Sequence, residues 1–188
     1  MPEINSSPSS NENVQNSRGL TSGRLVTELA EMLRNDPFWS GFFRDQERTD
    51  WGLHVAIFRE PFLTWVLDGR KRVESRFSQN QVAPFGEVHI GDVIALKRVA
   101  GPIVGLCLVN ATWSYRLDPK TWTYIRDHFS PLLCADNEEF WSSRKDARFA
   151  TLISLDHVQS IPQIQYPKSD RRGWVVERGR SSQQVLNL

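Results

Sequence analysis

The residues of this chain whose types and spacing could do chemistry lie in the segment over residues 68–77. Lys71, Glu74 and Arg76 bring an ammonium group, a carboxylate and a guanidinium close together in the sequence. From Arg72 onward the pattern has period two, so a strand would place Arg72, Glu74 and Arg76 on one face, about 7 Å apart. Such a face suits the binding of one polar ligand from several sides. The alternative is a solvated turn with a Glu74–Arg76 ion pair that contributes little to stability.

The element that must position these residues is a short helix predicted over residues 61–67. A proline in its first turn and the i, i+3, i+4 spacing of Phe62, Trp65 and Val66 both favour it. Gly69 follows where helices commonly end in a left-handed residue, a conformation that glycine adopts without a Cβ penalty. The charged residues therefore begin at a helix-to-strand junction.

The spacing Gly69-x-Lys71-x-x-Glu74-x-Arg76 resembles the G-x-K-x-x-E-x-R signature of ASCH domains, which belong to the PUA-like superfamily. Residues 90–96 resemble the family's v-G-D-x-i turn and strand. Residues 104–109 resemble the next strand of the family, i-x-G-x-x-x-v. Taken together, these motifs extend the similarity over residues 53–176. The resemblance implies an α+β fold, a PUA-like small mixed β-barrel with flanking helices.

The chain has 188 residues, which is enough for one domain with a core and terminal extensions. Four parts are predicted: a disordered N-terminal tail over 1–20, a helical and aromatic arm over 21–50, the ASCH (PUA-like) domain over 51–178, and a flexible C-terminal end over 179–188. Strands are predicted over 54–58, 72–77, 87–90, 93–98, 103–115, 150–158 and 173–177. Two helices, over 119–129 and 138–148, are expected to begin after the cap residues Asp118 and Asn137.

Composition limits the classes of function. The 23 basic and 22 acidic residues nearly balance, so any attraction for nucleic acid must come from a local patch. Cys107 and Cys134 are isolated, which predicts neither a metal site nor a disulfide framework, and no cofactor is expected. No stretch has the length of a membrane span or the pattern of a signal peptide, so a cytoplasmic protein without a membrane partner is expected.

Further residues could line the same cleft as the signature. Basic residues interleaved with aromatic ones suit nucleic acid, since cations contact phosphates while rings stack on bases. Trp113 could instead be a core residue, and Arg171 with Arg172 a solvated turn. The candidate ligand-binding residues are Gly69, Arg70, Lys71, Glu74, Arg76, Asn80 in the polar loop over 78–86, Lys97, Arg98, Trp113, Tyr115, Arg171 and Arg172.

The aromatic cluster Phe38, Trp39, Phe42 and Phe43 in the arm has two interpretations. The first is packing of the arm onto the barrel, because aromatic residues mostly serve cores. The second is a surface for a protein partner.

Two functions compete for the signature residues. In a module that binds RNA or a nucleotide, Lys71 and Arg76 contact phosphate, and Glu74 accepts hydrogen bonds from base or ribose donors. In an enzyme, Lys71 acts as general base or nucleophile activator if Arg70 and Arg72 suppress its protonation. Glu74 then shuttles the proton, and Arg76 stabilises developing negative charge.

The resemblance implies both functions. Some small ASCH proteins are amidohydrolases that act on N4-acetylated cytidine, others are ribonucleases, and others bind nucleic acid. This chain departs from the amidohydrolase branch, which has threonine at the position of Glu74 and lacks the helical segment over 118–148. A recessed, contacting pair of Lys71 and Glu74 would favour hydrolysis, such as ribonuclease or acylated-nucleoside amidohydrolase activity. An open groove with Lys97, Arg98 and Arg171 at its rim would favour binding.

Overall fold

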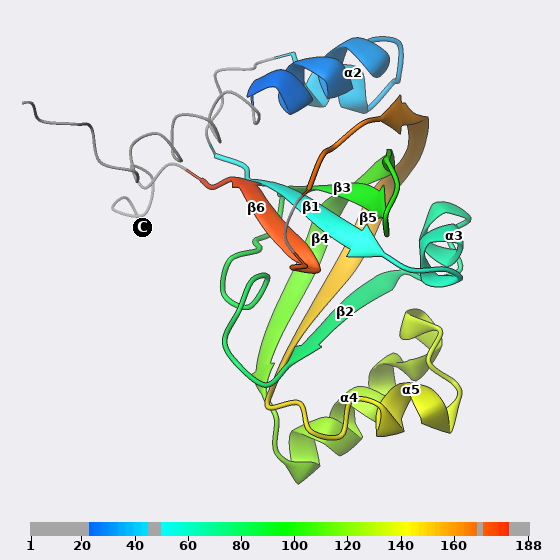
Figure 1. Cartoon of the computed structure of the whole chain (residues 1–188), viewed down its shortest axis with the longest axis vertical. Helices are drawn as coiled ribbons and strands as arrows, with labels where there is room; N and C mark the ends of the chain where they lie inside the picture. Colours follow the sequence, from blue (N-terminus) through cyan, green and yellow to red (C-terminus); the bar gives the residue numbers. More distant parts are fainter. Residues whose placement is uncertain (1–22, 45–49, 169–170, 181–188) are drawn as a thin grey trace, which may run out of the picture. The chain divides into compact units, whose positions relative to one another are not determined.

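The computed structural model describes residues 23–44, 50–168 and 171–180 and divides the chain into two compact units, Met1–Glu47 and Arg48–Leu188 (Figure 1). The tail expected over 1–20 lies outside the described residues. Of the C-terminal end expected over 179–188, only the first two residues are described.

In the first unit, residues 23–32 are helical and a second, short helix, α2 (Trp39–Phe42), follows. Asp36 fixes the entry to α2, because its carboxylate accepts hydrogen bonds from the backbone N–H groups of Phe38 and Trp39 at 2.9 and 2.8 Å. The predicted aromatic cluster exists as mutual ring contacts, among them Trp39 on Phe43 at 5.6 Å between centroids. Its role as a surface for a protein partner stays a prediction.

The second unit is built on one mixed sheet of six strands. Their order across the sheet is β2-β5-β4-β3-β1-β6, and only the β1–β3 pair among the described strands is parallel. The strands are β1 (Leu53–Phe58), β2 (Val73–Ser78), β3 (Val93–Arg98), β4 (Ile103–Arg116), β5 (Phe149–Ile164) and β6 (Trp174–Arg178).

The sheet curls until its two edges approach each other. Arg76 on the edge strand β2 donates hydrogen bonds to the carbonyl oxygens of Ile57 in β1, at 3.1 Å, and of Gly173 just before β6, at 2.9 Å. The sheet is therefore a six-stranded half-barrel, as the α+β, barrel-like class predicted from the sequence requires.

Helices cover the sheet on both of its faces. The short helix α3 (Phe62–Leu67) buries Leu63 and Val66 in a core with the inner faces of β1, β3 and β4. Helices α4 (Pro119–Leu133) and α5 (Glu138–Ser142) lie together beside β2 (Figure 1). They form a second core with the alternate residues Ala150 and Leu152 of β5. Across residues 23–44, 50–168 and 171–180, no helix combines the length and the apolar character that crossing a membrane requires.

The predicted helix caps are confirmed. Asp118 accepts a hydrogen bond from the backbone N–H of Thr121 at 2.7 Å, and Asn137 accepts one from Phe140 at 2.8 Å. Helix α4 buries Ile125, together with Phe129 and Leu133 at i+4 and i+8, which explains its amphipathic pattern.

Two predicted elements were wrong. Residues 87–90 do not form a strand, because the chain there turns toward Asp92, whose carboxylate accepts a hydrogen bond from the backbone N–H of His89 at 2.7 Å. The helix expected over 138–148 ends at Ser142. An α-helix would continue with a bond from the Arg144 N–H to the Phe140 carbonyl, but the guanidinium of Arg144 occupies that carbonyl at 2.6 Å.

Gly105 in β4 lies where a side chain would have no space. A Cβ at this position would lie 2.7 Å from Cδ2 of Leu67 and 2.9 Å from the carbonyl oxygen of Gln159. We expect Gly105→Ala to lower the free energy of unfolding by about 2 kcal/mol, measured by urea denaturation, because the backbone of β5 at Gln159 must shift and Leu67 must repack. Gly179→Ala, where a Cβ meets nothing within 4 Å, is the control. Equal stability of both variants would show that β5 and Leu67 accommodate the methyl group without cost.

Candidate functional site

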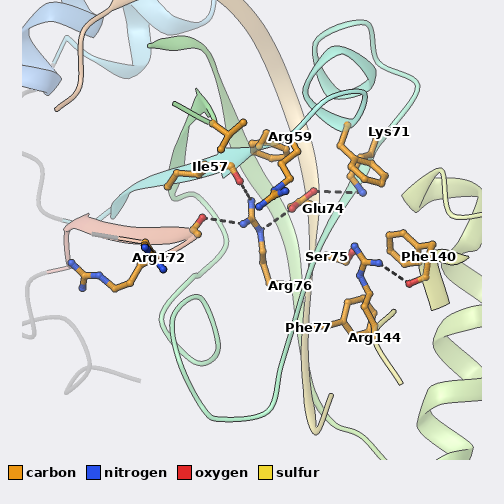
Figure 2. Close-up of a pocket in the computed structure, with 15 residues that line it drawn as sticks. Ile57, Arg59, Lys71, Glu74, Ser75, Arg76, Phe77, Phe140, Arg144 and Arg172 are labelled. Carbon is orange, nitrogen blue, oxygen red and sulfur yellow. Dashed lines mark hydrogen bonds and ion pairs between the residues drawn. The ribbon is translucent and has the colours of Figure 1, made fainter. Parts of the chain in front are cut away.

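A cavity of about 360 Å³ opens where β2, α3, α5 and the residues before β6 converge (Figure 2). This volume lies at the lower end of the range usual for small-molecule sites. Its lining consists of Ile57, Phe58, Arg59, Phe62, Lys71, Glu74, Ser75, Arg76, Phe77, Val99, Phe140, Arg144, Arg171, Arg172 and Gly173. The signature segment therefore lies against this cavity.

Lys71 is the most deeply buried basic residue of the cavity lining. The helix-to-strand junction positions it, since its backbone N–H donates to the carbonyl of Trp65 in α3 at 2.7 Å, before β2 begins at Val73. Its side chain is 2% exposed, and Nζ lies 3.0 Å from the carbonyl oxygen of Leu133 and 3.5 Å from Oε2 of Glu74. Burial lowers the pKa of Lys71, and the nearby carboxylate of Glu74 offsets only part of that effect.

Glu74 lies between two cations. Besides its contact with Lys71, Oε1 is 2.8 Å from Nε of Arg76, and the residue is 6% exposed. A carboxylate oxygen has more than one acceptor direction, so each oxygen keeps room for a ligand donor. The arrangement holds an acceptor of fixed orientation inside a cationic environment.

Arg76 is committed to the protein rather than to solvent. Its Nη1 and Nη2 atoms bind the carbonyls that close the half-barrel, and its guanidinium lies 5.2 Å from the ring centroid of Phe58 and 5.3 Å from that of Trp174. Gly173 permits this approach, because a Cβ there would lie 3.1 Å from Nη1. Arg76 thus fixes the two sheet edges and orients Glu74 from the side opposite to Lys71, as Figure 2 shows.

The structure brings five of the predicted ligand-binding residues to the cavity. These are Lys71, Glu74, Arg76, Arg171 and Arg172. The prediction that Arg72 shares the face of Glu74 and Arg76 was wrong. Arg72 is exposed, because the strand starts one residue later and Lys71 takes the inward position at the junction.

The other predicted ligand-binding residues do not line the cavity. Gly69 ends α3 with a φ of 78°, and Arg70 pairs with Asp68 on the surface. Asn80 is exposed in its loop, and Arg98 pairs with Glu60.

Lys97, Trp113 and Tyr115 also lie away from the cavity. The ammonium of Lys97 is buried against the carbonyls of Arg98 and Gly101, and burial lowers its pKa. Trp113 packs edge-on against Phe129 of α4, at 5.3 Å between ring centroids, so it belongs to the core beneath the helices. Tyr115 packs against that core as well.

Sequence reasoning missed Arg59, Phe62, Phe140 and Arg144 as cavity residues. Phe62 was assigned to a helix face, and Arg59 directly follows β1 without a pattern that marks it. Phe140 lies in α5 and Arg144 just after it, more than sixty residues after the signature in the sequence. The aromatic and basic residues that follow the Asn137 cap were the only sequence feature that could have indicated Phe140 and Arg144 as cavity residues.

Charge in the cavity is strongly one-sided. Of the described residues that line it, six are basic and one, Glu74, is acidic, whereas the whole chain carries a formal net charge of only +1. Aromatic rings of Phe58, Phe62, Phe77 and Phe140 occupy the same lining. No group of three or more histidine, cysteine or acidic side chains that could hold a metal ion occurs in the described part of the chain.

The half-barrel with its flanking helices is an ASCH-type fold, as the resemblance of the sequence predicted. It is similar to an ASCH protein from Zymomonas mobilis. A variant of that protein matches with a TM-score of 0.50 at 14% identity, over 62% of this chain and 75% of that one. The crystal structure of the ASCH protein itself from that organism gives a TM-score of 0.49 at 14% identity, over 60% of this chain and 73% of that one. No protein-family model and no curated protein matches the chain.

Proposed function

We propose that this protein binds RNA or a nucleotide in the cavity around Lys71, Glu74 and Arg76. The observation that carries the proposal is the one-sided lining, in which six basic side chains and several aromatic rings surround a single carboxylate. A ligand that matches it must combine negative charge, a flat apolar face and a hydrogen-bond donor. Nucleotides have all three.

The cavity residues divide into roles that fit this class of ligand. The side chains of Arg59 and Arg171 are exposed and have no hydrogen-bond or ion-pair partner among the described residues, so they are available to phosphate. Glu74 is the acceptor for an amino or hydroxyl group of base or ribose. Arg76 holds Glu74 in place, and Lys71 keeps positive charge behind it.

Hydrolysis of a nucleic-acid-derived substrate is the second candidate function. It is favoured by the recessed contact between Lys71 and Glu74, both almost fully buried with Nζ and Oε2 3.5 Å apart. The lowered pKa of Lys71 suits a general base or a nucleophile activator. In addition, Lys97 and Arg98 do not form a rim at this cavity, as an open binding groove would require.

The experiment that tests the binding function measures the fluorescence anisotropy of short labelled single-stranded RNAs across a salt series. We expect the double variant Arg59→Gln, Arg171→Gln to bind about ten-fold more weakly than the wild type, with a shallower salt dependence, because phosphate contacts are lost. The matched control is Lys120→Gln, Lys145→Gln, which removes the same charge from exposed positions outside the cavity. Equal weakening in both double variants would mean that binding is a diffuse effect of charge.

Product formation is followed in the same samples, with acylated ribonucleosides added as a second substrate set. Loss of turnover in both Lys71→Met and Glu74→Gln, at temperatures where each is folded, would assign hydrolysis to this pair. Salt-sensitive retention of RNA without any product would assign binding alone. If the wild type shows neither retention of RNA nor formation of product, both candidate functions are contradicted.

A further inference from the structure

The α4–α5 segment sends one guanidinium into the cavity. Arg144 follows α5 and stacks on the ring of Phe140, with 3.8 Å between the guanidinium carbon and the ring centroid. Its Nη1 atom donates to the carbonyl of Phe140 at 2.6 Å and lies 2.9 Å from Oγ of Ser143. Stacking and these two bonds fix the plane of the side chain before any ligand arrives.

Arg144 keeps donors for a ligand. Its Nε and Nη2 atoms have no hydrogen-bond partner among the described residues, and the side chain is half-buried beside Phe77. Burial lowers the pKa of Arg144, and Glu74 offsets part of this, so an anion at this position would restore favourable interactions that water cannot supply. Two N–H groups in one plane match the geometry of a phosphate group.

A second cationic region lies on the other side of the cavity. Figure 2 shows Arg172 and Arg144 on opposite sides of the Glu74–Arg76 pair, with Arg59 above that pair. Arg171, the residue before Arg172, adds a further exposed guanidinium to the cavity lining. Glu74 and Arg76 pair with each other between the two regions, and Arg59 lies above that pair. Arg144 and Arg171 therefore supply positive charge to the cavity from two separate segments of the chain.

We propose that these two regions are separate phosphate subsites, one made by Arg144 and the other by Arg171 and Arg172. The preferred ligand is then a nucleotide with phosphate on both its 5′ and 3′ sides, which is an internal nucleotide of a single strand of nucleic acid. A cavity of about 360 Å³ accepts one nucleotide unit and leaves the neighbouring units outside. This inference rests on the proposed function and adds the chemical form of its ligand.

The first test uses only the wild-type protein and competition against a labelled single-stranded RNA. The competitors are the four common ribonucleosides, their 5′-monophosphates, their 3′-monophosphates and their 3′,5′-bisphosphates. We expect a bisphosphate to compete about ten-fold more strongly than either monophosphate of the same base, because each subsite contributes a charge-assisted contact. Equal competition by monophosphates and bisphosphates would overturn the second subsite while leaving the proposed function intact.

The second test assigns each phosphate to its side of the cavity. Arg144→Gln should weaken the bisphosphate and one monophosphate by about ten-fold and leave the other monophosphate within about two-fold of wild type. The double variant Arg171→Gln, Arg172→Gln should show the converse pattern. Lys145→Gln, which removes the neighbouring exposed charge outside the cavity, should change neither.

Three results would contradict the inference. Arg144→Gln weakening nucleosides as much as bisphosphates would mean that Arg144 only maintains the shape of the cavity. Loss of the same monophosphate in both variants would mean a single phosphate site. If Arg144→Gln does not fold, as judged by thermal denaturation, the wild-type competitor series still decides between one phosphate subsite and two. Absence of any RNA or nucleotide binding by the wild type would overturn the proposed function together with this inference.

Discussion

Glu74→Gln should lower the free energy of unfolding by about 4 kcal/mol, although it changes only one side-chain atom. The wild-type carboxylate neutralises two cations, Lys71 at 3.5 Å and Arg76 at 2.8 Å, in a site where Glu74 is 6% exposed. The neutral amide leaves a buried ammonium and a partly buried guanidinium without a counter-charge. Removing one partner of a buried ion pair has a far larger cost than the net contribution of the intact pair.

The loss should depend on pH in a defined direction. Burial already lowers the pKa of Lys71, and Glu74 is the main influence that raises it, so the variant lowers that pKa further. A lysine with a depressed pKa in the folded state binds fewer protons there than in the unfolded state, so stability increases as pH rises toward the unfolded pKa. The difference between wild type and variant should therefore shrink as pH increases.

Urea denaturation at several pH values measures both effects. Glu60→Gln is the matched control, because Glu60 also pairs with an arginine, Arg98, but is 41% exposed, and its loss should cost less than about 1 kcal/mol. The double variant Lys71→Met, Glu74→Gln should be more stable than the sum of the single effects predicts. Additive losses would contradict the ion-pair account, as would a Glu74→Gln effect no larger than that of Glu60→Gln.

Local sequence patterns predicted the elements that carry the signature. The apolar spacing before Gly69 and the period-two pattern after it correspond to α3 and β2, with Gly69 in the left-handed conformation between them. These features depend on interactions within a few residues, so one segment of sequence contains the information. The caps at Asp118 and Asn137 are local in the same sense.

The composition of the cavity could not be predicted in this way. Arg144 reaches the neighbourhood of Glu74 only because α4 and α5 fold back against β2 and β5. Trp113 was a candidate for either the ligand or the core, and it belongs to the core because the helical segment covers that face of β4. Which face is covered depends on contacts between residues far apart in the sequence, and periodicity is the same for both faces.

A second buried carboxylate organises the part of the half-barrel around the start of β1. Asp92 is fully buried and accepts hydrogen bonds from the backbone N–H groups of Gly52 and His89, from Nε2 of His54 at 3.1 Å and from Nε of Arg180 at 2.8 Å. Nε1 of Trp174 donates to Nδ1 of His54 at 3.2 Å, so the proton of the imidazole lies on Nε2 and points to Asp92. A Cβ at Gly52 would lie 3.0 Å from Oδ1, so a side chain there would crowd the carboxylate.

We expect Asp92→Asn to lower the free energy of unfolding by about 3 kcal/mol at neutral pH. The amide presents N–H donors where the carboxylate accepted hydrogen bonds, and it leaves Arg180 without its counter-charge. Because this network ties the strands β1 and β6 to the turn before β3, the loss should affect cooperative unfolding rather than local opening. Urea denaturation and amide hydrogen exchange of β1 and β6 measure it.

The pH dependence of the stability difference between wild type and Asp92→Asn isolates the contribution of the ionised carboxylate. Burial raises the pKa of Asp92, but the hydrogen bonds from His54, Gly52, His89 and Arg180 outweigh burial and lower it to about 2. Because the folded-state pKa lies below the unfolded value of about 3.9, the ionised carboxylate adds about 2 kcal/mol to stability. This contribution is complete above the unfolded pKa and is lost as pH falls toward 2. The amide of the Asp92→Asn variant does not titrate, so the stability difference should shrink by that amount between about pH 5 and about pH 2.

Other carboxylates do not obscure this result. The pKa values of Glu60 and Asp118 are also lowered, but both residues are present in wild type and variant, so their contributions cancel in the difference. Asp118→Asn is a matched control, because its carboxylate caps α4 at the surface and asparagine is an equally good cap. A stability difference that stays constant with pH would mean that Asp92 acts by packing alone and that its four donors do not hold it ionised.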